Sequence, residues 1–284
     1  MKMIWWLVIL TAIAGVGGTG LGGLVGAILR RDSHKIVSLL LSFAGGVMMA
    51  VVCFDLIPSS LMPEGATERT SIWVVLIGVL VGYVIIYILN ALIDRATNHE
   101  VEHIDENHPK TADDLDELIH SDHLNEHKKT GQFRDLFIAG VVMACAIALH
   151  NLPEGMVIGA SYAGQSATEF AGSGLILAIV IGLHNIPEGM AVAVPLITGG
   201  TSKARAVLIT ALSGAPTIIG AIIGYSLGLL SPIWLAVSLS FASGAMLYVV
   251  FGELLPEAIL MWRSKMPALF TLIGTLVGLL LVEI

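Results

Sequence analysis

The chain has 284 residues, of which 56% are hydrophobic and only 13% are charged, and its formal net charge is -8. A soluble domain carries about 25% charged residues, so this composition excludes an ordinary soluble domain and indicates a membrane protein. We therefore expect the lipid bilayer as its surroundings and no nucleic-acid partner.

Apolar runs long enough to cross a membrane occur along most of the chain. A spanning helix needs about 20 apolar residues. Eight runs approach or exceed this length: 3–29, 36–58, 72–93, 136–162, 174–198, 204–230, 233–255 and 267–282. The sequence predicts an all-α membrane protein with eight transmembrane helices, the eighth being the shortest. The first run begins like a signal peptide, but it continues without a break to Leu29, so we expect it to remain as a helix.

The two cysteines, Cys53 and Cys145, both lie within apolar runs. Such positions give no disulfide framework. We expect both side chains to be buried as small hydrophobic groups, since free cysteine behaves in this way in protein cores.

Basic residues are distributed unequally between the two sides that eight helices would create. Of the 14 Lys and Arg residues, only Lys2 and Arg69 fall on the side of the termini. The remaining residues fall in or beside the opposite connections: Arg30, Arg31, Lys35, Arg95, Lys110, Lys128, Lys129, Arg134, Lys203, Arg205, Arg263 and Lys265. Because Lys and Arg are enriched on the cytoplasmic side, we expect both termini to be extracytoplasmic, in a plasma membrane.

Parts of the chain repeat each other. FAGGVMMAVVCFDLIP at 43–58 recurs as FASGAMLYVVFGELLP at 241–256, and LIGVLVG at 76–82 recurs as LIGTLVG at 272–278. Helices one to three thus match helices six to eight. Each matched pair is five helices apart in chain order, an odd offset, so the second copy must cross the membrane in the opposite direction. The sequence predicts a 3+2+3 inverted repeat, an arrangement found in many secondary transporters.

This repeat divides the chain into four parts: 1–93 with the first repeat, 94–132 as a polar cytoplasmic loop, 133–199 with helices four and five, and 200–284 with the inverted repeat. We expect the loop to be mostly disordered. Six of the nine histidines fall within it: His99, His103, His108, His120, His123 and His127. The loop either captures or senses metal ions or is a solvated linker, and the irregular histidine spacing does not decide between these alternatives.

A polar heptapeptide occurs twice in helices four and five. HNLPEGM begins at His150 and HNIPEGM begins at His184, and Glu154 and Glu188 follow four residues later on the same helix face. An acidic side chain in the middle of a membrane costs about 3 kcal/mol on insertion scales. A divalent cation bound between the two helices would neutralise both carboxylates and accept imidazole nitrogens as further ligands.

Two alternative roles of the heptapeptides stay open from the residues alone. One is a hydrogen-bonded polar cluster that only specifies helix packing, and the second is a proton relay without metal. If a metal binds, imidazole and carboxylate ligands favour zinc, iron, manganese, cobalt or nickel over Cu(I), magnesium or calcium.

The eight helices, the histidine-rich loop and the motifs HNLPEG and HNIPEG resemble the ZIP family (Zrt-/Irt-like proteins) of divalent-metal transporters, most closely its prokaryotic-type branch. The resemblance implies inward transport of zinc and related metals, including cadmium, at a two-ion or adjacent-ion site formed by helices four and five. The ligands that it implies are His150, Asn151, Glu154, His184, Asn185 and Glu188. Met48 resembles a position where some members place a thioether ligand, and a core methionine is the alternative.

The chain departs from the family pattern at helix six and at the second heptapeptide. Thr217, in SGAPTIIG, stands where related members often carry a glutamate, and His184-Asn185 stands where some have Gln-Asp. We therefore expect one strong ion position and a weaker or absent neighbour. Asp55 and Glu253, which precede prolines, could line entrances to the pathway, and we expect them to be solvated carboxylates near helix ends.

Together these features predict a secondary transporter that moves divalent transition metals, zinc first, into the cytoplasm. No GxxxxGK[ST] motif occurs, so ATP is not its direct energy source. The metal is substrate, and we expect no resident cofactor and no enzymatic activity. The alternatives are an intramembrane metalloenzyme, which would need a further base, and a metal sensor. Gly18, Gly22 and Gly26 would permit close packing within the chain or in a homodimer.

Overall fold

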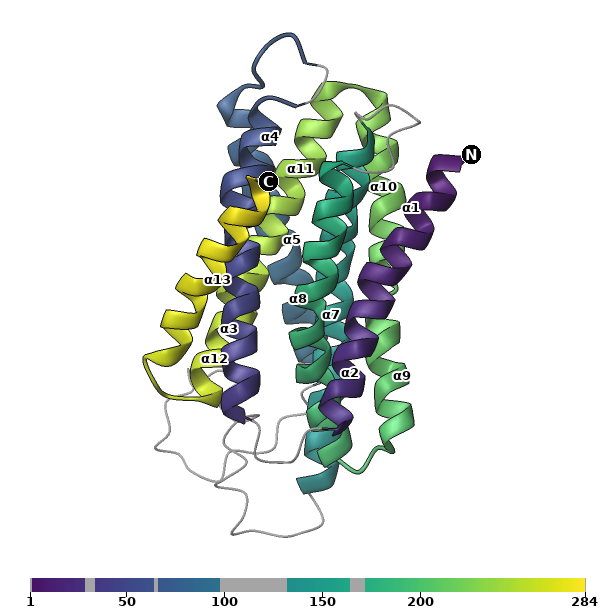
Figure 1. Ribbon diagram of the computed structural model, residues 1–284, viewed down its shortest axis with the longest axis vertical. Coiled ribbons are helices and arrows are strands. Elements are labelled where there is room, and N and C mark those ends of the chain that lie inside the picture. The colour runs from purple at the N-terminus through teal and green to yellow at the C-terminus, as the bar shows by residue number, and fades with distance from the viewer. Residues whose placement is uncertain (1, 29–33, 64–65, 98–131, 164–171, 284) are drawn as a thin grey trace.

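The computed structural model describes residues 2–28, 34–63, 66–97, 132–163 and 172–283 (Figure 1). Every regular element in these ranges is a helix, which confirms the all-α membrane fold. The elements are α1 (Lys2–Ala12), η1 (Ile13–Gly17), α2 (Gly18–Ile28), α3 (His34–Val51), η2 (Val52–Leu56), α4 (Ile57–Leu61), α5 (Ile72–Thr97), α7 (Gln132–Ala163), α8 (Ser173–Thr198), α9 (Lys203–Ser213), α10 (Pro216–Leu230), α11 (Pro232–Tyr248), η4 (Val249–Leu254), α12 (Leu255–Met261) and α13 (Met266–Val282).

Several elements join end to end into long rods that match the predicted spans. The first two are Met3–Ile28 and Lys35–Leu61, and two more are Lys203–Leu230 and Pro232–Met261. With α5, α7 and α8 they make seven helices in the described residues that are long and apolar enough to cross a membrane. The eighth, α13, has 17 residues. The eight predicted helices are therefore all present, and the last is the shortest.

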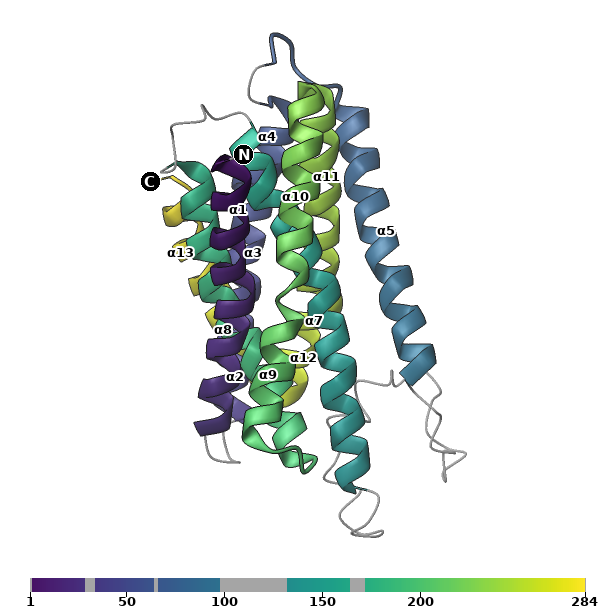
Figure 2. The same cartoon turned by 90° about the vertical axis from the view of Figure 1, so that its right-hand side faces the viewer.

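Successive spans run in opposite directions, and both termini lie near the same end of the bundle (Figure 1). The helices α7 and α8 lie in the interior, where most of their side chains are buried. In contrast, α5 stands at the edge (Figure 2) and exposes large apolar side chains such as Trp73, Ile77 and Leu80. In a membrane protein these side chains face lipid, which accepts the same apolar residues as the core.

Short π-helical segments interrupt the second and seventh spans at repeated positions. The segments η2 and η4 each end shortly before a proline, Pro58 or Pro256. Proline disrupts the regular hydrogen bonds of an α-helix, and a π turn is one way in which a helix accommodates such a change. Asp55 and Glu253 lie inside these segments, within the spans. Glu253 is buried, and Asp55 is partly buried and accepts a hydrogen bond from Ser59 Oγ at 3.2 Å. The expectation of solvated carboxylates near helix ends was therefore wrong.

The predicted burial of the cysteines was also wrong. Cys53 in η2 and Cys145 in α7 are free thiols with exposed side chains. Their position in apolar runs suggested burial. An apolar run does not show which face of its helix is inside, since lipid and core select similar residues.

Glycines bring helices into backbone contact at matching positions in the two halves of the chain. A Cβ atom on Gly22 of α2 would overlap the carbonyl oxygen of Ile186 in α8, and one on Gly220 of α10 would overlap that of Leu152 in α7. The two glycines are 198 residues apart, which is the offset of the repeat, and Leu152 and Ile186 occupy the same place in the two heptapeptides. The inverted repeat stays a prediction, and these matched contacts are the kind that it requires.

The three glycines of the first span pack inside the chain. Cβ atoms on Gly18, Gly22 and Gly26 would each meet residues of α8. Small residues allow membrane helices to approach closely. This glycine pattern therefore serves the contact between the first and fifth spans, and a homodimer would have to use another surface.

We expect Gly220→Ala to lower the unfolding temperature of the purified protein in detergent, because the added methyl group has no room beside the carbonyl oxygen of Leu152. Overpacking of this kind costs about 1–3 kcal/mol. The control is Gly17→Ala in η1, where the nearest atoms lie 3.9 Å from the added Cβ. That substitution should leave the unfolding temperature unchanged or raise it. Equal unfolding temperatures for Gly220→Ala and the wild type would contradict the close contact of α10 and α7.

Candidate metal centre

The two heptapeptides lie on neighbouring antiparallel helices in the interior of the bundle (Figure 1). Pro153 and Pro187 are inside α7 and α8, and both helices continue through them. Because residues four apart share a helix face, Glu154 and Glu188 can each point toward the facing helix with the histidine of their own motif. The repeated sequence thus brings polar groups from two helices to one level of the bundle.

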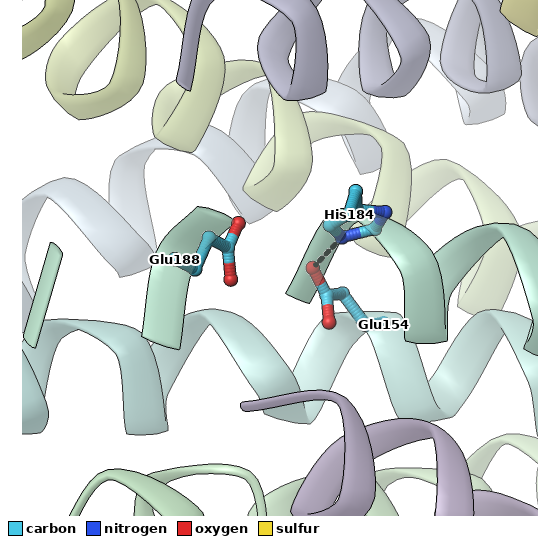
Figure 3. A group of neighbouring side chains, drawn as sticks. All are labelled: Glu154, His184 and Glu188. Carbon is cyan, nitrogen blue, oxygen red and sulfur yellow. Dashed lines mark hydrogen bonds and ion pairs between the residues drawn. The ribbon is translucent and has the colours of Figure 1, made fainter. Parts of the chain in front are cut away.

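Three of the predicted ligands form a compact buried cluster (Figure 3). Glu154 of α7 and His184 and Glu188 of α8 each offer one ligand atom, and these atoms lie within 4.8 Å of one another. The His184 Nε2 atom lies 2.7 Å from Glu154 Oε1. Neither carboxylate oxygen of Glu188 has a hydrogen-bond partner, and neither does Oε2 of Glu154. Buried polar groups are nearly always paired, so open oxygens in this position are suited to a cation.

His150 lies outside this cluster and faces another helix. Its Nε2 atom is 3.3 Å from Oε2 of Glu253 in η4, and neither of its ring nitrogens makes a hydrogen bond. Sequence reasoning missed Glu253 as the partner of a heptapeptide residue. The available signal was the repeat itself, because a carboxylate that recurs at matched places in two apolar runs is costly in a membrane and needs a partner.

The side chain of Asn151 is fully hydrogen-bonded. Its Nδ2 group donates to the carbonyl oxygens of Ile147, at 2.9 Å, and Ser213, at 3.3 Å. Its Oδ1 atom accepts from Thr217 Oγ1 at 2.9 Å and from Asn185 Nδ2 at 3.3 Å. The bond to Ile147 lies within α7, and the other three connect α7 with α8 and with the sixth span.

Asn185 is bonded through its nitrogen only. Its Nδ2 group donates to Asn151 and also to the carbonyl oxygen of Ala14 in η1, at 3.2 Å. Its Oδ1 atom is buried and has no hydrogen-bond partner. The two asparagines therefore differ in the state of their oxygens, although their sequence surroundings are nearly identical.

The remaining predicted site residues are Met48 and the histidines of the polar loop. Met48 is buried in the apolar core together with Met156 and Met190, which is the alternative that the sequence left open for it. Its role as a thioether ligand stays a prediction. All six histidines of the polar loop lie outside the described residues.

Comparison with known proteins agrees with this geometry. The description "ZIP Zinc transporter" belongs to a family model that matches residues 2–284 of the chain. The chain belongs to the ZIP family. It is 33% identical over 264 residues to the zinc transporter ZupT of Clostridium perfringens, and the aligned region covers 91% of this chain and 88% of that protein. It is 35% identical over 256 residues to the zinc transporter ZupT of Chlorobium luteolum, with 88% of this chain and 86% of that protein covered. The resemblance drawn from the heptapeptides is confirmed.

We expect Glu188→Gln to have opposite effects on this ZIP protein with and without metal. In the presence of a chelator the variant should unfold at a higher temperature than the wild type, because it removes a buried carboxylate with no hydrogen-bond partner. On addition of Zn2+ the wild type should gain stability through ligand binding and the variant should gain much less. Thermal unfolding in detergent measures both effects. A Zn2+-induced increase of the same size in both proteins would show that Glu188 does not bind the ion.

Proposed function

We propose that this ZIP protein is a secondary transporter that carries a divalent transition-metal ion, with zinc as the main substrate, through the plasma membrane into the cytoplasm. The observation that carries the proposal is the buried cluster of Glu154, His184 and Glu188, whose ligand atoms lie within 4.8 Å of one another. The cluster lies within apolar spans, where buried carboxylates are costly unless a counter-charge accompanies them.

The chemistry of the cluster fits one divalent ion. Two carboxylates supply a formal charge of two, which a single divalent cation neutralises, and His184 adds a nitrogen ligand when its hydrogen bond to Glu154 is exchanged for the metal. Nitrogen and oxygen ligands suit zinc and its neighbours in the first transition series. The ion is the cargo, and its own gradient or an exchange of protons would supply the driving force.

The pair of His150 and Glu253 lies beside the cluster, toward the end of the bundle opposite the termini. His150 precedes Glu154 by one turn of α7, in the direction of the helix start. That start lies at the end of the bundle opposite both termini (Figure 1). Like Glu188, His150 is displaced from the Glu154–His184 contact in this direction, so an ion that leaves on this side passes an imidazole and a carboxylate 3.3 Å apart.

Basic residues support the proposed direction of transport. The helices α3, α9 and α13 all begin at the end of the bundle opposite the termini (Figure 1). Lys35 and Lys203 lie in the first turns of α3 and α9, and Lys265 directly precedes α13. Because positive charge is retained in the cytoplasm, this end is assigned to the cytoplasm and the termini to the outside.

Uptake of radioactive zinc into proteoliposomes tests the proposal. The wild type should show saturable uptake, and the double variant His184→Ala/Glu188→Ala should lose it, because only one cluster carboxylate remains to hold the ion. The control is Asn90→Ala, which removes a buried polar side chain from a spanning helix but breaks only a 3.0 Å hydrogen bond between α5 and Tyr248. Asn90→Ala should retain uptake.

If the folded double variant transported zinc at the wild-type rate, the cluster would not be the transport site. If the wild type transported neither zinc nor iron, manganese, cobalt or nickel, the proposed function would be wrong.

Orientation can be tested separately in intact cells. An epitope tag fused to either terminus should bind antibody without permeabilisation, whereas the same tag inserted between residues 98 and 131 should bind only after permeabilisation. The reason is the retention of basic residues on the cytoplasmic side. The reverse pattern of labelling would invert the assigned direction.

A further inference from the structure

We propose that Thr217 is a positioning residue that holds the amide oxygen of Asn151 away from the metal, so that the site takes a single ion. This inference rests on the proposed function, since it concerns the same cluster. It assigns different roles to the two asparagines of the heptapeptides, of which only Asn185 keeps an oxygen open to an ion.

The argument begins with the hydrogen-bonding capacity of an amide side chain. An asparagine oxygen has two acceptor positions and its nitrogen has two hydrogens. In Asn151 all four are used, since the oxygen accepts from Thr217 and Asn185 and the nitrogen donates to two backbone carbonyl groups. A metal ion could bind this oxygen only if it displaced one of the two donors.

The orientation of the Asn151 amide follows from its partners. The carbonyl oxygens of Ile147 and Ser213 can only accept hydrogen bonds, so the group that faces them must be the NH2 group. The oxygen therefore faces Thr217, whose hydroxyl donates to it at 2.9 Å. Rotating the amide by half a turn would leave the two carbonyl groups opposite an oxygen.

The matching residue in the other half of the repeat makes no such contact. Thr19 lies 198 residues before Thr217 and is equally buried. Its hydroxyl donates to the carbonyl oxygen of Gly15 at 2.9 Å and lies 3.5 Å from that of Ala211. Asn185, the counterpart of Asn151, keeps an oxygen with no hydrogen-bond partner. The hydroxyl of Thr217 therefore occupies the side-chain oxygen of Asn151, whereas that of Thr19 leaves the side-chain oxygen of Asn185 without a hydrogen bond.

Charge also limits what the Asn151 side of the cluster can hold. Glu154 and Glu188 balance one divalent ion, and a second ion would need further anionic ligands in a buried position. On the side where Asn151 lies, the neighbouring side chains are the hydroxyl of Thr217 and the amide of Asn185, which are both neutral. A second divalent ion placed there would carry an uncompensated charge.

Cobalt(II) bound to the full-length protein in detergent provides the test, because its visible absorption depends on the number and type of its ligands. Four proteins are compared: the wild type, Thr217→Val, Thr217→Ser and the matched control Thr19→Val. Equilibrium dialysis gives the number of Co2+ ions per chain, and the spectrum is recorded at saturation. Thr217→Ala removes the same hydroxyl with a smaller side chain and replaces Thr217→Val if that variant does not fold.

We expect one Co2+ per chain in the wild type. Thr217→Val should weaken and shift the visible bands, because the freed oxygen of Asn151 becomes an additional ligand. Thr19→Val and Thr217→Ser should retain the wild-type spectrum, since the hydroxyl of Thr19 bonds to backbone carbonyl groups and the second variant keeps a hydroxyl.

Two Co2+ ions per wild-type chain, a Thr217→Val spectrum that superimposes on the wild type, or an equal change in Thr19→Val would each overturn the inference while leaving a metal site in place. Failure of the wild type to bind any Co2+ would instead overturn the proposed metal site, and this inference with it.

Discussion

The buried carboxylates of Glu154 and Glu188 are the constraint on which the rest of the structure depends. Each costs about 3 kcal/mol in the middle of a membrane on insertion scales, and no described residue donates a hydrogen bond to Glu188. The two groups also repel each other, because their oxygens belong to one cluster. Such an arrangement requires surrounding helices that hold it in place, and a divalent cation would neutralise its charge.

The helices that hold the cluster pack against each other with their backbones in contact. Glycine contacts connect α2 with α8 and α10 with α7, through Gly22 and Gly220. A second set connects α3 with α13 and α11 with α5, through Gly46 and Gly244. All three cluster residues belong to the first set of helices, whereas Glu253, the partner of His150, belongs to the second. A movement of one set against the other would therefore change the contact of His150 while leaving the cluster intact.

Much of the fold and part of the site could be predicted from the sequence, for physical reasons that also set the limit. Spanning helices need long apolar runs, and two acidic heptapeptides in such runs are too costly to be accidental. The direction of each side chain could not be predicted, because lipid and core select similar residues on a helix surface. This is why Cys53 and Cys145 are exposed and why the partner of His150 was missed. The saturated state of Asn151 depends on backbone carbonyl groups of two helices, which leave no trace in composition or spacing.

The two heptapeptides are nearly identical in sequence but unequal in their contacts, and this inequality creates the open ligand. His184 bonds to Glu154 across the helix pair, and an exact two-fold relation would bond His150 to Glu188. His150 instead faces Glu253, at 3.3 Å. The residue that matches Glu253 is Asp55, which is one methylene shorter and accepts a hydrogen bond from Ser59. His150 thus has a carboxylate neighbour outside the pair, and both oxygens of Glu188 are without a hydrogen-bond partner.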